Sequence, residues 1–134
     1  MTLYPESSGV VTFAKLAPDT LVTKGETLLK LDDRDQALAV RQAEVELAEA
    51  KRTLKRYLSL NATEANIPQS TIDTAQSNVD LAEIRLAQAK VELSRRQVTA
   101  PFSGRIGITD VEIGDRVDTS TAVSYTHLRA HETQ

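Results

Sequence analysis

Apolar residues recur at alternating intervals of three and four along two long stretches of this chain, and no other feature constrains its fold as strongly. This spacing is the a/d pattern of a heptad repeat, which gathers apolar side chains on one face of an α-helix. The first stretch carries Val40, Ala43, Leu47, Ala50, Leu54 and Tyr57, and the second carries Ile72, Ala75, Val79, Ala82, Leu86, Ala89 and Leu93. Residues 34–97 are therefore predicted to form a coiled-coil hairpin of two antiparallel helices.

The two stretches also predict how they pair. If the chain folds back at Glu64 and Ala65, the numbers of facing residues sum to 129, and five successive layers place one large residue opposite one Ala. Such layers let two helices approach closely without a void or a clash. The predicted pairs are Val40–Ala89, Ala43–Leu86, Leu47–Ala82, Ala50–Val79, Leu54–Ala75 and Tyr57–Ile72. Flanking pairs of opposite charge follow the same register: Glu44–Lys90, Glu46–Arg85 and Lys51–Glu83.

The segments on either side of the hairpin have the composition of short β-strands. Ser8–Leu16 and Glu26–Leu31 are rich in Val, Leu, Phe and Thr and are separated by turn residues. The segment after the hairpin repeats this pattern at an offset of 95 residues, so that Ile106 corresponds to Val11. Residues 1–33 and 98–122 are therefore predicted to form one small β domain, giving an α+β fold that the hairpin splits.

The last twelve residues do not continue either pattern. They contain both histidines of the chain, His127 and His131, and the string Ser124–Thr133 resembles translated sequencing-adapter read-through. Two histidines four residues apart could share a metal ion, but no third ligand is in view, so we predict no metal site. Residues 123–134 are expected to be a non-native or disordered tail outside the fold.

Composition excludes several classes of function. The net charge of −3, with both signs mixed, does not suggest a nucleic-acid surface, and the absence of Cys excludes a disulfide framework and a thiolate nucleophile. No run approaches the roughly 20 apolar residues of a membrane span. The acids Asp32, Asp33 and Asp35 have no His or Cys nearby in the sequence, so they suit a helix start better than acid/base catalysis. We therefore predict no catalytic residue and no cofactor.

One family combines these features. A β half-motif, a helical hairpin, and then the runs Ala100–Gly107 and Glu112–Val117 resemble the periplasmic adaptor (membrane fusion) subunits of bacterial tripartite efflux pumps, in the branch that serves resistance-nodulation-division (RND) transporters. Lys24–Asp32 resembles the strand that leads into the hairpin of these adaptors. The resemblance covers Leu3–Ala122 and implies a biotinyl/lipoyl-like β domain. It also implies a β-barrel domain and a membrane-proximal domain that this chain is too short to include, so we expect a fragment.

The same resemblance implies a function without catalysis. Such an adaptor is periplasmic and associated with the inner membrane, although this chain carries no targeting or anchor segment. It links an inner-membrane RND transporter to an outer-membrane channel and self-associates as a trimer or hexamer. One alternative is an adaptor of a type I secretion system or an ABC-type exporter. A lipoyl or biotinyl carrier is a weaker alternative, because the turn Ala17–Thr20 has no Lys to modify.

The resemblance also implies a partner-binding site at the hairpin tip. In these adaptors an Arg on the first helix, a Leu four residues later and a Ser after the turn contact the outer-membrane channel. Arg56 and Leu60 match the first two by spacing, Pro68 stands where the Ser is expected, and Ser70 follows. The alternative is that Arg56 is an ordinary helix-end cation paired with Asp73.

A second apolar set lies away from the heptad seam: Leu38, Val45, Ile84 and Val91. An isolated helical rod rarely exposes such residues. We expect them to pack laterally against neighbouring hairpins in a ring, and the alternative is that they are scattered surface residues.

Overall fold

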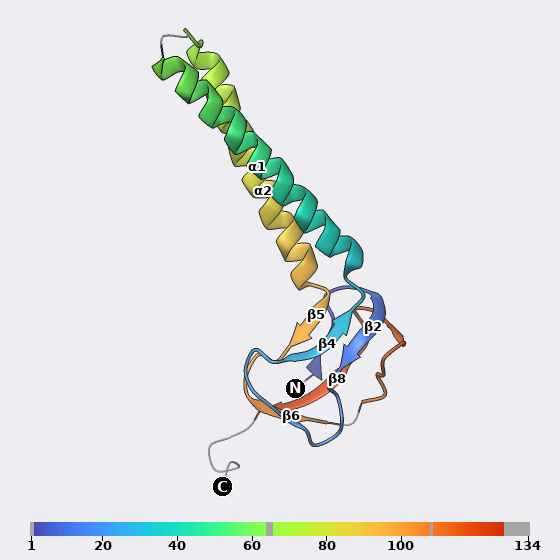
Figure 1. The fold of residues 1–134 in the computed structure, drawn as a ribbon. Helices are drawn as coiled ribbons and strands as arrows, with labels where there is room; N and C mark the ends of the chain where they lie inside the picture. The colour runs from blue at the N-terminus through green and yellow to red at the C-terminus, as the bar shows by residue number, and fades with distance from the viewer. Residues whose placement is uncertain (1, 64–65, 108, 128–134) are drawn as a thin grey trace. The chain divides into compact units, whose positions relative to one another are not determined.

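The computed structural model describes residues 2–63, 66–107 and 109–127. The chain forms two compact units: a helical hairpin, Arg34–Leu93, and a β unit built from the residues before and after it. The fold is therefore α+β, with a β unit assembled from both ends of the chain (Figure 1).

Helix α1 spans Arg34–Ala62, and helix α2 spans Gln69–Ser94 and runs antiparallel to it (Figure 1). Every residue of the predicted heptad seam is buried or half-buried. Outside the seam, all helical residues are exposed except Gln36, Thr53 and Thr71. The predicted seam is thus confirmed, whereas the pairing of individual layers remains a prediction.

The boundaries of α2 follow from its flanking residues. The carbonyl of Pro68 accepts hydrogen bonds from the amides of Thr71 (3.0 Å) and Ile72 (3.3 Å), so Pro68 lies just before the first turn, where its missing N–H costs nothing. At the other end, α2 stops at Ser94 and a strand begins at Gln97. The helical part is therefore shorter than the predicted 34–97.

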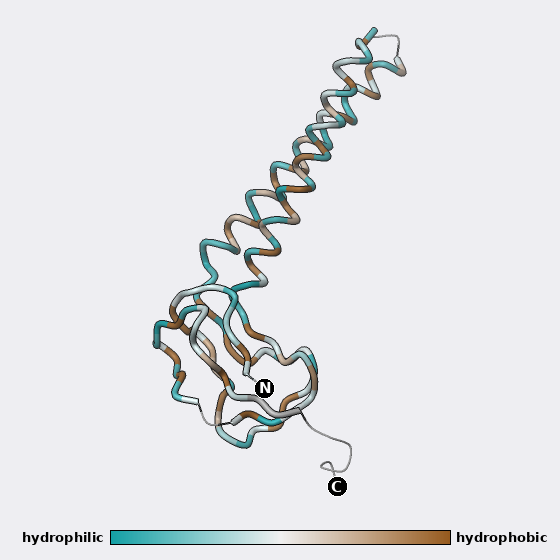
Figure 2. Tube along the Cα trace, turned by 180° about the vertical axis from the view of Figure 1, so that it is seen from behind, coloured by the Kyte–Doolittle hydropathy of each residue, from teal (hydrophilic) through white to brown (hydrophobic). Residues whose placement is uncertain are grey.

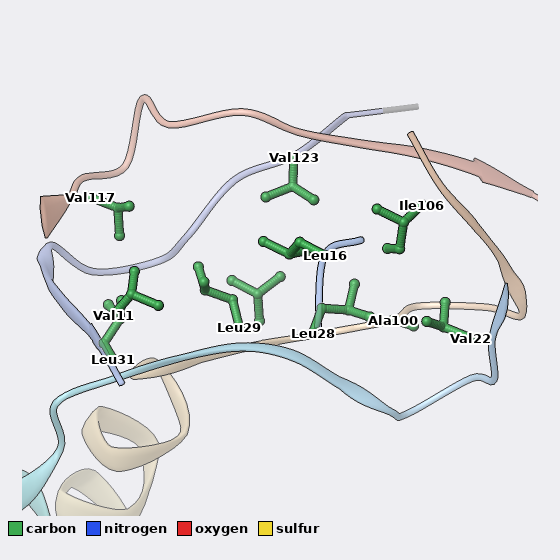
Figure 3. Close-up of a cluster of buried hydrophobic side chains, with 11 residues drawn as sticks. Val11, Leu16, Val22, Leu28, Leu29, Leu31, Ala100, Ile106, Val117 and Val123 are labelled. Carbon is green, nitrogen blue, oxygen red and sulfur yellow. The ribbon is translucent and has the colours of Figure 1, made fainter. Parts of the chain in front are cut away.

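The β unit contains two four-stranded sheets with the strand orders β1-β8-β6-β3 and β5-β4-β2-β7. The strands are β1 Thr2–Leu3, β2 Gly9–Ala14, β3 Leu21–Val22, β4 Thr27–Leu31, β5 Gln97–Thr99, β6 Gly104–Ile106, β7 Arg116–Val117 and β8 Val123–His127. Side chains from both ends of the chain meet in one core, in which Leu28, Leu29, Leu31 and Ile106 are almost fully buried (Figure 3). Each sheet thus contains strands from both chain ends.

The predicted offset of 95 residues is a structural pseudo-symmetry. Asp19 and Gly114, which are 95 residues apart, both have positive φ angles, of 65° and 94°. The amide of Asp19 donates to the carbonyl of Ile106, and the amide of Gly114 donates to the carbonyl of Val11, each at 2.9 Å. Since Val11 and Ile106 are also 95 residues apart, these two hydrogen bonds are equivalent. Each half of the β unit thus donates the same hydrogen bond to the other half.

Strand β8 corrects the prediction for the tail. It pairs with β1 on one side and with β6 on the other, and the side chain of Val123 is fully buried in the core. The expectation that residues 123–127 lie outside the fold is therefore wrong. Residues 128–134, including His131, lie outside the described part of the chain.

The pseudo-symmetry explains why a strand is needed at β8. Strand β4 lies between β5 and β2, just as β8 lies between β1 and β6. The offset here is 94 rather than 95: the pair Leu29–Val98 corresponds to the pair Val123–Leu3. This shift of one residue hides the relationship between β4 and β8 from a comparison at constant offset.

Candidate functional site

The hairpin tip is held by hydrogen bonds from side chains to the backbone. The hydroxyl of Thr63 donates to the carbonyls of Ser59 and Leu60, at 3.2 Å each. Across the turn, the amide of Ile67 donates to Oδ1 of Asn61 at 3.4 Å. These bonds occupy backbone groups that a helix end leaves without an intrahelical partner, and so define the tip.

All four residues predicted at the tip are exposed to solvent: Arg56, Leu60, Pro68 and Ser70. Arg56 and Leu60 are four residues apart on α1 and therefore lie on the same side of its last turns. Nη2 of Arg56 donates to Oγ1 of Thr53 at 3.4 Å, whereas the carboxylate of Asp73 accepts from Nε2 of Gln69 at 2.9 Å. The two charged groups thus contact partners on their own helices.

A cleft of about 290 Å³ lies between the two helices near the tip. It is lined by Thr53, Tyr57, Ser70, Thr71, Thr74, Ala75 and Asn78. Of these residues, only Ser70 was predicted from the sequence to belong to a site. The available signal was that short hydroxyl residues, Thr53 and Thr71, flank the seam near the tip. Farther from the tip, the equivalent heptad positions carry long charged residues such as Glu46 and Arg85.

Charges are segregated along each helix. The acids of α1 lie in its first half and its basic residues lie mostly toward the tip. Helix α2 has the same order of charges along its own sequence, so its acids lie mostly toward the tip because the two helices are antiparallel. In the tip half, α1 carries Lys51, Arg52, Lys55 and Arg56, and α2 carries Asp73, Asp80 and Glu83. In the other half, α1 carries Asp35, Glu44, Glu46 and Glu49 along with Arg34 and Arg41, and α2 carries Arg85, Lys90 and Glu92. The tip end of α1 is therefore strongly basic.

The second apolar set is exposed on two opposite faces of the hairpin. The exposed fractions are 63% for Leu38, 58% for Val45, 53% for Ile84 and 47% for Val91. At 3.6 residues per turn, a residue five positions after a seam residue at heptad position a points away from the partner helix. Val45 follows Val40 by five, and Ile84 follows Val79 by five, so each helix carries its own outward stripe. Apolar residues recur along the full length of both helices (Figure 2).

Two acidic groups of the β unit, Glu26 and Asp118, have structural roles. The ammonium of Lys15 and the amide of Thr23 donate to the carboxylate of Glu26 and lower its pKa. The hydroxyl and amide of Ser120 likewise lower the pKa of Asp118. Both groups stabilise turns in their ionised form, which does not suit a general acid. In the described ranges, no group of three or more His, Asp or Glu residues could hold a metal ion.

Comparison with known families decides what kind of protein carries this hairpin. Residues 1–126 match the family model described as "RND MFP, barrel-sandwich hybrid domain", where MFP denotes membrane fusion protein. The chain belongs to this family. The match covers the β unit from both chain ends and the hairpin between them, and so includes both parts of the fold. Among the described residues of this membrane fusion protein, no helix is long and apolar enough to cross a membrane.

Curated relatives agree with the family match. The multidrug resistance protein MdtA of Yersinia pestis is 29% identical over 114 residues, which cover 75% of this chain and 26% of MdtA. An uncharacterized protein of Haemophilus influenzae is 26% identical over 121 residues, which cover 90% of this chain and 31% of that protein. The chain thus spans between a quarter and a third of the length of these relatives.

Solved structures show the same fold. A MacA–MexA chimera that contains the α-hairpin domain of Pseudomonas aeruginosa MexA matches with a TM-score of 0.85 at 23% identity, over 96% of this chain and 48% of the chimera. The membrane fusion protein Spr0693 of Streptococcus pneumoniae matches with a TM-score of 0.69 at 17% identity, over 92% of this chain and 58% of Spr0693. The combination of a β unit and a helical hairpin therefore recurs in proteins of distant sequence.

Proposed function

We propose that this chain is the hairpin-bearing part of a periplasmic, non-enzymatic adaptor that links an inner-membrane RND transporter to an outer-membrane channel for the efflux of small molecules. The match to the membrane fusion protein family over residues 1–126 carries this proposal. MdtA, a relative named for multidrug resistance, supports small-molecule drugs as the substrate class. The substrates would pass along the assembled adaptor without chemical change.

The hairpin tip would dock on the outer-membrane channel. Its end exposes the apolar side chain of Leu60 beside the guanidinium of Arg56, so it offers both a contact surface and a charge. Neighbouring basic residues extend the positive potential, which would favour acidic groups or helix carbonyl ends on the partner. Pro68 and the side-chain bonds of the turn hold this surface in shape, which reduces the entropy lost on docking.

The outward stripes would pack hairpins side by side around a ring. Because Leu38 and Val45 lie on α1 and Ile84 and Val91 lie on the opposite face, α1 of one copy can pack on α2 of the next. Contacts between two different surfaces close into rings when the rotation permits it.

The charge distribution supports the same arrangement. With all tips pointing the same way, the basic tip half of α1 would lie beside the acidic tip half of the neighbouring α2. The acidic half of α1 would lie beside Arg85 and Lys90 of that neighbour. Contacts between two copies of α1 would instead bring like charges together, so the pattern selects unlike helices. The ring would be a trimer or hexamer, as the resemblance to these adaptors implies.

Deletion of the gene for the complete adaptor tests this function. The deletion strain should accumulate a fluorescent efflux dye and become sensitive to drugs that the pump exports, and a plasmid copy should restore both properties. Unchanged accumulation in a strain that lacks other adaptors of this family would contradict the proposal. The strain without other adaptors is needed because a second pump could export the same dye.

A further inference from the structure

The cleft between the helices lies on only one flank of the hairpin. It begins at Thr53 and Tyr57 on α1 and reaches Asn78 on α2, which places it directly below the tip. Thr53 and Thr71 are two of the three helical residues outside the seam that are half-buried, and they form the sides of the cleft. At the same level on the other flank lies Gln76, which does not line the cleft.

The lining of the cleft is polar and uncharged. Hydroxyl groups of Thr53, Tyr57, Ser70 and Thr71 and the amide of Asn78 can all donate hydrogen bonds, and no carboxylate is among the lining residues. Oγ1 of Thr53 accepts a hydrogen bond from Arg56, which leaves its own proton to donate elsewhere. The guanidinium of Arg56 therefore adds a positive charge at the rim of a surface that is rich in donors.

Such a surface complements the C-terminal end of an α-helix. The last four carbonyl groups of a helix have no intrahelical donor, and the helix dipole places roughly half a negative charge there. The cleft volume of about 290 Å³ is many times the roughly 10–15 Å³ that a cavity needs to hold one water molecule, so the cleft has room for polar groups of a partner.

We propose that this cleft receives the carbonyl end of a helix of the outer-membrane channel. The inference rests on the proposed docking function and adds residues to it, because Thr53, Thr71 and Asn78 would then determine which channel fits. The cleft is continuous with the tip surface, since Ser70 belongs to both and Arg56 bonds to Thr53. Binding to the tip would therefore bring a channel helix next to the cleft.

Binding of the 134-residue chain to the outer-membrane channel of the same bacterium, purified in detergent, tests this proposal. One variant, Thr53→Leu with Asn78→Leu, fills the cleft. Its matched control, Ala48→Leu with Gln76→Leu, adds the same two side chains, one on each helix, at exposed positions outside the cleft. A third variant, Thr53→Val with Thr71→Val, removes two donors and keeps the shape. Circular dichroism and thermal melts verify that each variant folds.

The filled variant should lose more than tenfold in affinity, the valine variant should lose about tenfold, and the control should stay within about twofold of the wild type. Equal binding of the filled variant and the control would overturn the proposal. A filled variant that binds the channel normally but fails to self-associate would also overturn it, because the occupant would then be a second copy of this chain. If the wild-type chain itself does not bind the channel, the docking function fails as well.

Discussion

Gly9 leaves the space that the guanidinium of Arg96 occupies, because a Cβ atom at residue 9 would overlap with Nη2 of Arg96. From this position, Arg96 donates through Nη1 to the carbonyl of Ser8 at 2.7 Å. It also donates through Nε and Nη2 to the carbonyl of Asp32 at 3.1 and 2.9 Å. One side chain thus joins the residues before β2, after β4 and before β5.

This relationship predicts that Gly9→Ala destabilises the β unit by about 1–3 kcal/mol. The Arg96 side chain can move away from the new methyl group, but the carbonyls of Ser8 and Asp32 then lose the hydrogen bonds that Arg96 donates. Urea denaturation of Gly9→Ala, Arg96→Met and the double variant measures the coupling. Gly9→Ala should cost much less when Arg96 is already absent, and strictly additive costs would show that the two residues do not act together.

Removal of residues 123–134 should strongly lower the melting temperature of the β unit. The truncation deletes β8, the strand that joins β1 to β6, and takes the fully buried Val123 out of the core. Truncation after His127 retains every described strand and is the control. Val123→Ala should cost about 2 kcal/mol through lost burial. A truncated chain that melts like the control would mean that β8 contributes nothing to the fold.

The heptad seam should not tolerate added bulk at its alanine positions. Ala82 is buried, so Ala82→Leu should cost about 1–3 kcal/mol by overpacking. If Leu47 faces Ala82, the second change Leu47→Ala should recover much of that loss. Thermal melts of the two single variants and the double variant measure the effect. A double variant no more stable than Ala82→Leu would contradict the predicted register.

The outward stripes should control self-association. Val45→Asp places a charge in the stripe of α1, whereas Ala48→Asp places the same charge on an exposed neighbouring position of that helix. Because a buried Val contributes roughly 1.5–3 kcal/mol, the first variant should weaken self-association at least tenfold and the second much less. Sedimentation of the complete adaptor measures both. Identical behaviour of the two variants would reduce the stripes to ordinary surface residues.

The long-period patterns of this chain could be predicted from its sequence. The seam was predictable because 13 residues repeat one spacing, and burial then follows from the period of the helix. The paired β halves were predictable because Val11 and Ile106 sit in similar local sequences. The same comparison failed at β8, where one residue fewer in the preceding turn shifts the offset and the strand is only five residues long.

The cleft at the tip could not be predicted in the same way. It results from small residues on two helices that are adjacent only when the hairpin forms. The short side chains beside the seam indicate little bulk on each helix, but they do not show that Thr53 and Asn78 line one cleft. The hydrogen bonds of Arg96 had no sequence signal either, because its partners are backbone carbonyls of residues 64 and 88 positions away. Such contacts depend on the tertiary arrangement alone.

The central claim, that the hairpin tip docks the adaptor on an outer-membrane channel, is tested most directly by reversing one charge at the tip. Arg56→Asp in the complete adaptor should abolish efflux-dependent drug resistance, and Leu60→Asp should do the same. Arg41→Asp is the control, because Arg41 lies on the same helix far from the tip. Immunoblots verify equal protein levels. Full resistance in both tip variants would contradict the account, whereas loss of resistance in these variants alone is the result that it predicts.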